Sequence, residues 1–390
     1  MDIIKEINGI RQEVIELRRD LHRHPELGFK EFRTAGIVKN YLEALGLDEV
    51  HTCSATGVIG ILKGGRPGKR VILRADIDAL PIQEESGEPF ASETPGIAHA
   101  CGHDGHTAML LGTAKIWAAH REEIPGTLVF LFQPNEEDAG AQIMIDEGAM
   151  EITGKPDAIF GYHLWANFSL GKIGVHAGPT MASSYYFKVK IHGKGGHGGE
   201  PHGAINPIDA ATYVLSAIKS FHTLEQDVFQ PTVITCCMIH AGQKEIIVPD
   251  DLEMEGSIRC LHQGHEAVHA RFREMVEQAC RLCRCSCEIE LKCGNSLLHN
   301  DEELTALALR TAEELVGPEN VVTKNVAMMG GDDFAEFLQY GPGFYFFIGM
   351  GDAAKGTDAH HHNAKFKVHE DALFIGMEMQ MNLVMNYLIQ

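Results

Sequence analysis

The chain has 390 residues, of which 44% are hydrophobic, so it is long enough for two hydrophobic cores, and we expect two domains. It carries 33 basic against 54 acidic residues, a formal net charge of −21, which argues against nucleic acid or an anionic membrane as a partner. No run is apolar enough to span a membrane, and the first 26 residues are charged throughout, unlike a signal peptide. Ten cysteines without a secretion signal are expected to be reduced, which favours the cytoplasm.

The first part of the chain predicts helices that alternate with strands. An amphipathic helix is indicated by apolar residues at helical spacing, namely Ile3, Ile4, Ile7, Ile10, Val14 and Leu17. Strands are predicted at 58–62, 71–73, 127–134 and 157–165, and further helices at 34–45, 105–119 and 140–148. Because the strands are almost continuously apolar, this alternation predicts an α/β layer with a largely buried sheet.

The pattern changes near residue 180, where "GPTMASS" is typical of a linker. The next elements are strand 185–193, helix 206–221, strand 232–240, strand 251–260, helix 263–280 and strand 286–293. Their order, βαββαβ, predicts a small ferredoxin-like unit. The earlier alternation then resumes with helix 301–315, strand 343–349 and helix 370–388. We therefore expect one α/β domain, 1–181 and 294–390, into which a second domain, 182–293, is inserted.

Metal-binding side chains gather in "GIAHACGHDGHTAML", residues 96–110, on the loop before a predicted helix. Cys101, His103 and His106 offer a thiolate and imidazoles, and glycines let the backbone approach closely. Further candidates follow the predicted strands: Glu136 and Glu137, His163, and the run His360, His361 and His362. Polar residues that follow strands of an open α/β sheet are expected to meet at one edge.

This number of ligands suits two divalent ions about 3.5 to 4 Å apart, which hold water and polarise a carbonyl. Adjacent glutamates at a strand end can separate, one binding metal and one facing the water. We assign Glu136 as the general base and Glu137 as a ligand. The alternative for this pair alone is a solvated acidic loop.

Seven ordered segments are similar to the amidohydrolase branch of metallopeptidase family twenty, which includes aminoacylases, hippurate hydrolases and hydrolases of indole-acetyl amino acids. They are "LHRHPELGF", "LRADIDALP", "HACGHDGHTAMLLG", "FQPNEE", "GYHLW", "GKGGHGGEPHGAINPI" and "GGDDF". The resemblance covers essentially the whole chain. It implies a di-metal α/β catalytic domain with an inserted ferredoxin-like lid domain that mediates dimerisation.

The resemblance implies that the metal ligands are Cys101, His103, Glu137, His163 and His362. The last of these aligns "HNAKF" with a His-x-Pro-x-aromatic pattern, although Ala364 stands where proline is common, so His361 is the alternative. His106 is then expected to support the helix start or the surroundings of the site.

Other site residues are also implied by the resemblance. Asp78 matches an aspartate that orients a metal ligand, and Asp76 has an uncertain role, with a structural ion pair as the alternative. His197 matches a histidine that reaches the partner subunit's active site and stabilises the oxyanion. Arg259 matches an arginine that holds the substrate carboxylate. Ile246 stands where relatives carry asparagine, which puts the usual substrate range in doubt.

A cysteine-rich stretch of the inserted domain contains Cys280, Cys283, Cys285, Cys287 and Cys293. The first two have metal-site spacing, so an additional zinc site is one hypothesis. The simpler interpretation is that these thiols point in several directions and pack as small apolar groups.

The sequence thus predicts a metal-dependent amidohydrolase that cleaves the amide bond of an N-acyl amino acid, as a homodimer or higher homo-oligomer. The expected cofactors are two divalent ions, zinc or manganese, with cobalt or nickel as alternatives because a thiolate softens the site. One alternative is a metal-dependent dipeptidase or carboxypeptidase. Another, of a different class, is a non-catalytic metal- or thiol-binding protein, against which the intact residues Cys101, Glu136, Glu137 and His163 speak.

Overall fold

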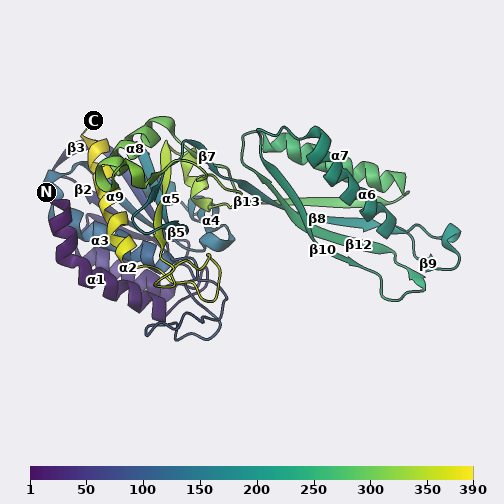
Figure 1. Cartoon of the computed structure of the whole chain (residues 1–390), viewed down its shortest axis with the longest axis horizontal. Coiled ribbons are helices and arrows are strands. Elements are labelled where there is room, and N and C mark those ends of the chain that lie inside the picture. The colour runs from purple at the N-terminus through teal and green to yellow at the C-terminus, as the bar shows by residue number, and fades with distance from the viewer. Residues whose placement is uncertain (390) are drawn as a thin grey trace. The chain divides into compact units, whose positions relative to one another are not determined.

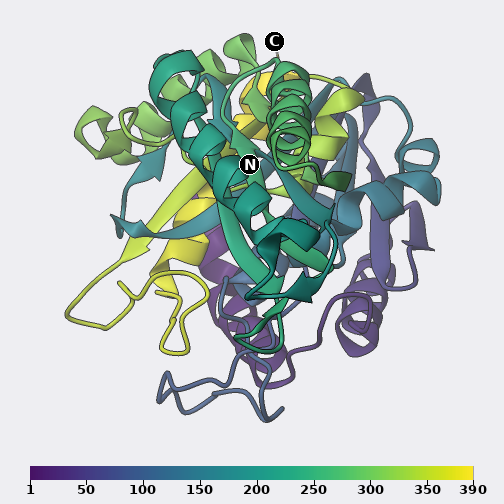
Figure 2. The same ribbon diagram turned by 90° about the vertical axis from the view of Figure 1, so that its right-hand side faces the viewer.

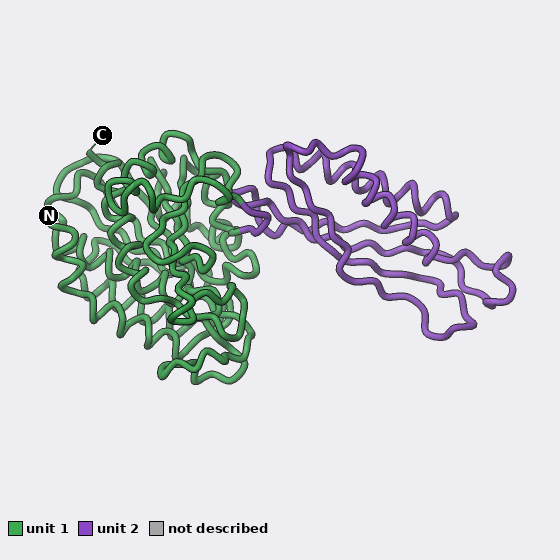
Figure 3. The backbone as a smooth tube through the Cα atoms, viewed as in Figure 1, with its two compact units in different colours: residues 1–180, 299–327, 332–390 green, residues 181–298, 328–331 purple. Residues whose placement is uncertain are grey.

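The computed structural model describes residues 1–389, which form two compact units (Figure 3). Unit 1 comprises Met1–Thr180, His299–Ala327 and Asp332–Gln390 apart from the last residue, and unit 2 comprises Met181–Leu298 and Met328–Gly331. Each unit has its own buried apolar cluster, as expected for a chain of this length. The two units are described separately.

Unit 1 is built around an eight-stranded mixed sheet (Figure 1). In spatial order its strands are β1 (Glu49–Cys53), β2 (Gly57–Lys63), β4 (Pro125–Gln133), β3 (Arg66–Asp76), β5 (Ala158–Ser169), β16 (Gly343–Gly351), β6 (Ile173–Gly174) and β15 (Val321–Val322). The four strands β4, β3, β5 and β16 run parallel and form its centre. Their nearly continuous apolar sequences are buried, as is usual for parallel strands covered on both faces.

Helices of unit 1 pack against this sheet and against one another. They are α1 (Ile3–Arg23), α2 (Phe32–Ala44), α3 (His103–Ala119), α4 (Gly140–Asp146), α5 (Ala149–Thr153), α8 (Glu302–Val316) and α9 (Asp371–Leu388). Helix α3 lies among α1, α2 and α9 and is buried along most of its length. A helix that is apolar on most sides has to be central, so α3 holds its N-terminal residues in a rigid position.

The amphipathic pattern of α1 shows how sequence determines this packing. Asp2 caps the helix by accepting a hydrogen bond from the Lys5 backbone N–H at 3.1 Å. Ile7, Val14 and Leu21 recur every seven residues and are all buried, the first two in the core of unit 1. Two helical turns separate successive members of this set, so they face the same side.

Unit 2 contains a four-stranded antiparallel sheet in the spatial order β10 (Thr232–Ala241), β12 (Asp251–Cys260), β8 (Ser183–His192) and β13 (Ser286–Asn295). Helices α6 (Pro207–Ser220) and α7 (His265–Leu282) lie side by side against one face of it (Figures 1 and 2). A short sheet of unit 2 pairs β9 (Gly196–His197) with β11 (Ile247–Val248). Another pairs β7 (Gly178–Met181) with β14 (Leu298–Asn300), most of whose residues belong to unit 1. In chain order the main elements of unit 2 follow β-α-β-β-α-β.

Two features differ from the expectation. Unit 2 runs from Met181 to Leu298 rather than from 182 to 293, and it also includes 328–331. The later segment joins it because the backbone N–H of Ala182 donates to the carbonyls of Met328 at 3.2 Å and Gly330 at 2.8 Å. Strand β5 continues to Ser169 rather than ending at residue 165, because β16 pairs with it as far as Ser169. Neither contact has a local sequence signal.

Among residues 1–389, no helix is both long and apolar enough to cross a membrane.

Candidate functional site

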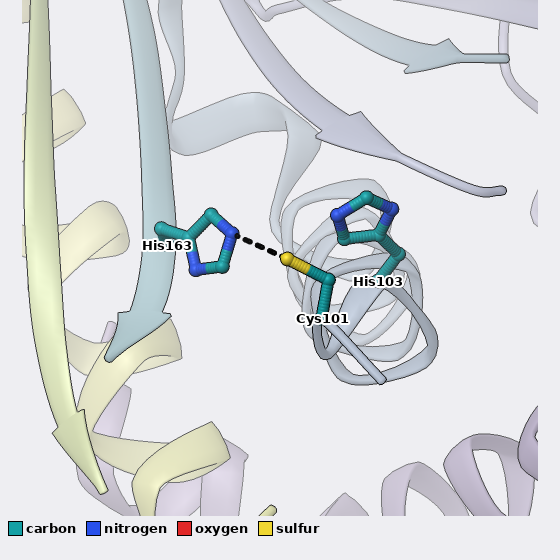
Figure 4. Close-up of side chains that lie close together, drawn as sticks. All are labelled: Cys101, His103 and His163. Carbon is teal, nitrogen blue, oxygen red and sulfur yellow. Dashed lines mark hydrogen bonds between the residues drawn. The ribbon is translucent and has the colours of Figure 1, made fainter. Parts of the chain in front are cut away.

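Cys101, His103 and His163 lie together in unit 1 (Figure 4). Cys101 and His103 stand at the start of α3, while His163 lies on β5, and the Cys101 Sγ is 3.5 Å from His163 Nε2. The turn into α3 requires Gly102, whose φ of 96° is a left-handed conformation that disfavours other residues. The three side chains are almost completely buried, so the elements that carry them hold them in place.

The ring orientation of each histidine leaves one nitrogen directed into the site. His163 donates from Nδ1 to the backbone carbonyl of Leu164 at 2.6 Å, so its Nε2 is the unprotonated nitrogen of the neutral ring. His103 Nδ1 lies 3.0 Å from the backbone carbonyl and 3.1 Å from the Oδ1 of Asp78. A second hydrogen bond that holds the outer nitrogen of a histidine is the usual arrangement at metal sites.

Glu136 and Glu137 lie beside His103 in the short helix η2 (Glu136–Asp138), just after β4. The His103 Nε2 is 3.9 Å from an oxygen of each carboxylate. Asp78 Oδ2 accepts the backbone N–H of Glu137 at 3.1 Å, so one aspartate supports both His103 and the glutamate turn. Asn135 starts this turn with a left-handed φ of 54°, a conformation that asparagine adopts more readily than most residues.

The C-terminal histidines occupy three different environments. His362 Nε2 lies 3.2 Å from Glu137 Oε1, and these two residues form a donor group with Cys101. His361 instead stacks on Trp165, with ring centroids 4.5 Å apart. His360 is exposed and belongs to none of the donor groups found among residues 1–389. The geometry therefore favours His362 over His361 as a metal-binding side chain.

Cys101 is common to two donor groups, one with His103 and His163 and one with Glu137 and His362, in each of which the ligand atoms lie within 4.8 Å of one another. A shared thiolate between two such groups suits a pair of neighbouring cations. The buried Nε2 of His103 has no hydrogen-bond partner among the described residues, which fits a nitrogen that binds metal. The residues present therefore fit two divalent ions.

The charges around this site favour a cation. Burial lowers the pKa of His103, but Asp76 and Asp78 outweigh it and raise this pKa to about 10. Burial raises the pKa of the Cys101 thiol well above its ordinary value, and Glu137 adds to the effect. Burial also raises the pKa of Glu136 well above its usual range, with a further contribution from Asp332. An ion of charge +2 would reverse each of these effects.

A buried ionic network below the site was not assigned from the sequence. The Arg74 guanidinium lies 2.6 Å from Asp76, 3.2 Å from Asp332 and 3.3 Å from Asp333, and it donates to Gln133 at 2.7 Å. All five side chains are buried. The signal that could have revealed it is an arginine inside the apolar strand sequence "VILRAD", since an arginine is rarely buried without partners.

Asp76 and His106 are engaged with each other rather than with the donor groups that contain Cys101. Asp76 Oδ1 and His106 Nδ1 are 2.6 Å apart, and His106 Nε2 accepts the backbone N–H of Leu164 at 3.0 Å. These contacts connect β3, α3 and β5 directly behind His163. Asp76 therefore has the structural ion-pair role that was one of its two interpretations, and His106 supports the surroundings of the site.

The remaining sequence candidates belong to unit 2. His197 is exposed on β9, and its Nδ1 accepts the backbone N–H of Gly199 at 3.0 Å. Arg259 on β12 donates to the backbone carbonyl of Met329 at 3.1 Å. Ile246 is 53% exposed. None of the donor groups found in residues 1–389 includes cysteines 280–293, in agreement with the simpler interpretation of that stretch.

Comparison with known proteins places this geometry in a family. Residues 72–386 match Peptidase family M20/M25/M40. Thermostable carboxypeptidase 2 of Saccharolobus solfataricus is 36% identical over 386 residues, which cover 96% of this chain and 96% of that protein. N-acetylcysteine deacetylase of Bacillus subtilis is 37% identical over 368 residues, 94% of each chain.

A solved structure leads to the same family. The Bacillus subtilis YXEP protein, a dinuclear metal binding peptidase from the M20 family, superposes with a TM-score of 0.84 at 33% identity over 98% of this chain and 99% of that one. The chain therefore belongs to peptidase family M20/M25/M40. It has a mixed α/β fold and is a metal-dependent hydrolase of amide bonds.

Proposed function

We propose that this hydrolase releases an amino acid and a carboxylic acid from an N-acyl amino acid. The observation that carries the proposal is the pair of donor groups that share Cys101, because together they offer ligands for two divalent ions. The similarity to N-acetylcysteine deacetylase over 94% of the chain supports this substrate class. The second candidate is a carboxypeptidase or dipeptidase, which the similarity to thermostable carboxypeptidase 2 favours.

In this proposal five side chains hold two divalent ions. They are Cys101, His103, Glu137, His163 and His362. When bound, the ions supply Lewis-acid chemistry, polarising the substrate carbonyl and making the attacking water more acidic. The thiolate favours zinc, cobalt or nickel by its softness, while manganese is the alternative that the resemblance implies.

Glu136 moves the proton in the proposed reaction. Its carboxylate lies 3.9 Å from His103 Nε2, beside the donor groups, and is only 11% exposed. It takes a proton from the attacking water and delivers it to the nitrogen of the leaving amine, so one water is consumed and the amide C–N bond breaks. Asp78 keeps His103 and the backbone of Glu137 oriented by the hydrogen bonds described above.

Two residues of unit 2 complete the proposed chemistry. We assign His197, from the partner subunit, to the developing oxyanion, since an exposed imidazole can reach another molecule. Arg259 is assigned to the substrate carboxylate, because a planar guanidinium binds a carboxylate through two parallel hydrogen bonds. Ile246 offers no polar contact, so a substrate that depends on an asparagine there would be disfavoured.

We also propose that unit 2 is a ferredoxin-like lid that mediates dimerisation, inserted in the α/β catalytic domain. Its β-α-β-β-α-β order and the sheet order β10-β12-β8-β13 support this description. Strand β10 forms an edge of that sheet and exposes Met238 and Ile239 at 43% and 44%. An apolar edge strand of this kind is a template for pairing with a second copy.

The ten free cysteines are consistent with a reducing compartment, and the cytoplasm stays a prediction.

The central test replaces Glu136 by glutamine. Glu136→Gln is expected to bind two equivalents of metal and to lose about 10²- to 10⁴-fold in kcat, because only proton transfer is removed. The measurements are metal content and turnover of N-acetyl, N-benzoyl and dipeptide substrates by the metal-loaded protein. Glu151→Gln, which changes an exposed carboxylate, is the control. Turnover near the wild-type rate would refute the assignment of Glu136, and preference for dipeptides would select the second candidate.

A further inference from the structure

His361, which is partly buried, contacts strand β5 from the loop that also carries His360 and His362. It lies next to His362 in sequence but is turned away from it, and neither of its nitrogens belongs to a donor group among residues 1–389. Its ring stacks on Trp165 with centroids 4.5 Å apart and an interplanar angle of 26°. It also meets His163 edge-on, at 5.0 Å and 89°. Two residues of β5 therefore hold the ring.

Backbone contacts determine which nitrogen of His361 carries the proton. The N–H of Ala166 donates to His361 Nε2 at 3.3 Å, so Nε2 must be an acceptor. In the neutral ring the proton is then on Nδ1. This nitrogen faces Cys101: it lies 4.0 Å from Sγ, and the ring is hydrogen-bonded to the Cys101 backbone. His361 thus presents a fixed N–H donor to the residue shared by both donor groups.

The backbone after His361 is held in an uncommon conformation. His362 has a left-handed φ of 62°, and its N–H donates to the carbonyl of Ala100 at 2.9 Å. A non-glycine residue keeps this conformation only where its surroundings determine it. The Trp165 stack immediately before it and the Ala100 hydrogen bond are two such constraints. His361 therefore restrains His362 as well as Cys101.

We propose that His361 is a positioning residue for the metal site, which fixes the Cys101 thiolate and the His362 imidazole relative to β5. The inference rests on the proposed di-metal function and adds to it a residue that binds no metal itself. Because one imidazole contacts Cys101, stacks on Trp165 and precedes His362, its loss should affect the second donor group, Cys101 with Glu137 and His362, more than the first.

The test uses cobalt(II) as the probe with the full-length protein. His361→Phe keeps a flat ring for the Trp165 stack and removes both hydrogen bonds. His361→Asn places an amide donor near the position of Nδ1, whereas His361→Gln places its amide near the position of Nε2. His360→Phe is the matched control, since it makes the same change at the exposed neighbour. The readouts are the affinity for each cobalt equivalent and the thiolate-to-cobalt absorption band.

His361→Phe is expected to weaken one of the two cobalt equivalents by roughly 10- to 100-fold and to move the thiolate band. His361→Asn should recover the band position better than His361→Gln does, and His360→Phe should match wild type. This comparison of Asn with Gln remains decisive if the phenylalanine variant does not fold.

Different results would contradict this inference and the proposed metal site. A wild-type protein that shows the thiolate band, together with unchanged affinity and band in His361→Phe, would overturn this inference alone. Recovery by glutamine rather than asparagine would overturn it as well, because the Ala166 contact would then be the one that matters. A wild-type protein that binds cobalt without a thiolate band would overturn Cys101 as a ligand, and therefore the proposed metal site.

Discussion

Arg74 is a fully buried cation that faces Asp76, Asp332 and Asp333 below the metal-binding groups. Moving these charges out of water costs free energy, and several short contacts between opposite charges compensate for that cost. The same side chain connects the end of β3 to the segment that starts at Asp332, so the network links these two parts of unit 1. A buried ion pair is weak evidence of net stability, but removing one partner leaves uncompensated charge.

We predict that Arg74→Met is strongly destabilising. Methionine fills a similar volume but removes the one cation that the three carboxylates share, which is expected to cost about 3 to 5 kcal/mol. The measurement is the free energy of unfolding from urea titration. Arg66→Met, at an exposed position of the same strand, should change stability by less than about 0.5 kcal/mol. A small effect of Arg74→Met would mean that the carboxylates are neutralised in another way.

Glu84 gives a pH-dependent prediction. Burial raises the pKa of Glu84, but hydrogen bonds from His22 and Ser86 and from the backbone of Ser92, together with the charge of His22, lower it to about 2. A carboxyl whose pKa is lower in the folded state stabilises the fold above its unfolded pKa of about 4.5, and this contribution is lost as the pH falls toward 2. The stability gap between wild type and Glu84→Gln should therefore narrow from pH 6 to pH 3.

Unfolding titrations at several pH values measure this gap. The neighbouring exposed Glu85 provides the control, since Glu85→Gln makes the same change at a solvent-exposed position. A gap for Glu84→Gln that stays constant down to pH 3 would contradict the lowered pKa.

At the scale of elements, a capping side chain marks the start of three helices, α1, α6 and α8. Helix α8 starts after Asp301, whose Oδ1 accepts the backbone N–H groups of Glu303 at 3.0 Å and Leu304 at 2.9 Å. These two donors would otherwise lack an intrahelical partner. The sequence predicted this helix at 301–315, one residue from its observed start, because the cap and the apolar spacing agree.

The cap of α8 can be tested directly. Asp301→Ala is expected to lower the free energy of unfolding by about 1 kcal/mol, because both hydrogen bonds are lost. Asp301→Asn keeps an acceptor oxygen and should retain most of the stability. Chemical denaturation of the three proteins measures this order, and equal stability of the alanine and wild-type proteins would show that the cap is unimportant.

At the scale of the whole molecule, two features affect whether copies of the chain associate. They are the net charge of −21 and the edge strand β10 of unit 2. A large net charge keeps molecules apart in general, so association needs a specific surface. The exposed apolar side chains of β10 offer such a surface on an unpaired sheet edge. The proposed dimer uses this edge, as an antiparallel sheet can extend by pairing with its copy.

We predict that the wild-type protein sediments as a dimer and that Ile239→Lys shifts it toward the monomer. A lysine on an edge strand opposes pairing with another copy. Glu290→Lys, an exposed change on the opposite edge strand β13, is the control and should stay dimeric. Sedimentation velocity over a range of concentrations distinguishes the two. A monomeric wild-type protein would refute the proposed dimer, whereas a dimer unaffected by Ile239→Lys would move the interface elsewhere.

Much of the fold could be predicted because its signals are local. The strands from 251 to 260 and 343 to 349 and the helix from 370 to 388 were placed almost at their observed bounds, since periodicity and burial agree there. The return of 328–331 to unit 2 and the length of β5 could not be predicted, because both depend on hydrogen bonds between segments far apart in sequence. The same limit applied to Arg74, whose partners Asp332 and Asp333 lie more than two hundred residues further along the chain.

The sequence by itself determined which residue types are available for chemistry, the alternation of helices and strands, and the likeness to a family of metallopeptidases. Only the tertiary structure decided which of three consecutive histidines faces Glu137, which nitrogen of His163 and His103 is free, and that Asp76 pairs with Arg74 and His106. The physical reason is that periodicity and capping act within a few residues. Ligand geometry and buried charge pairing instead depend on distances between segments that meet only after folding.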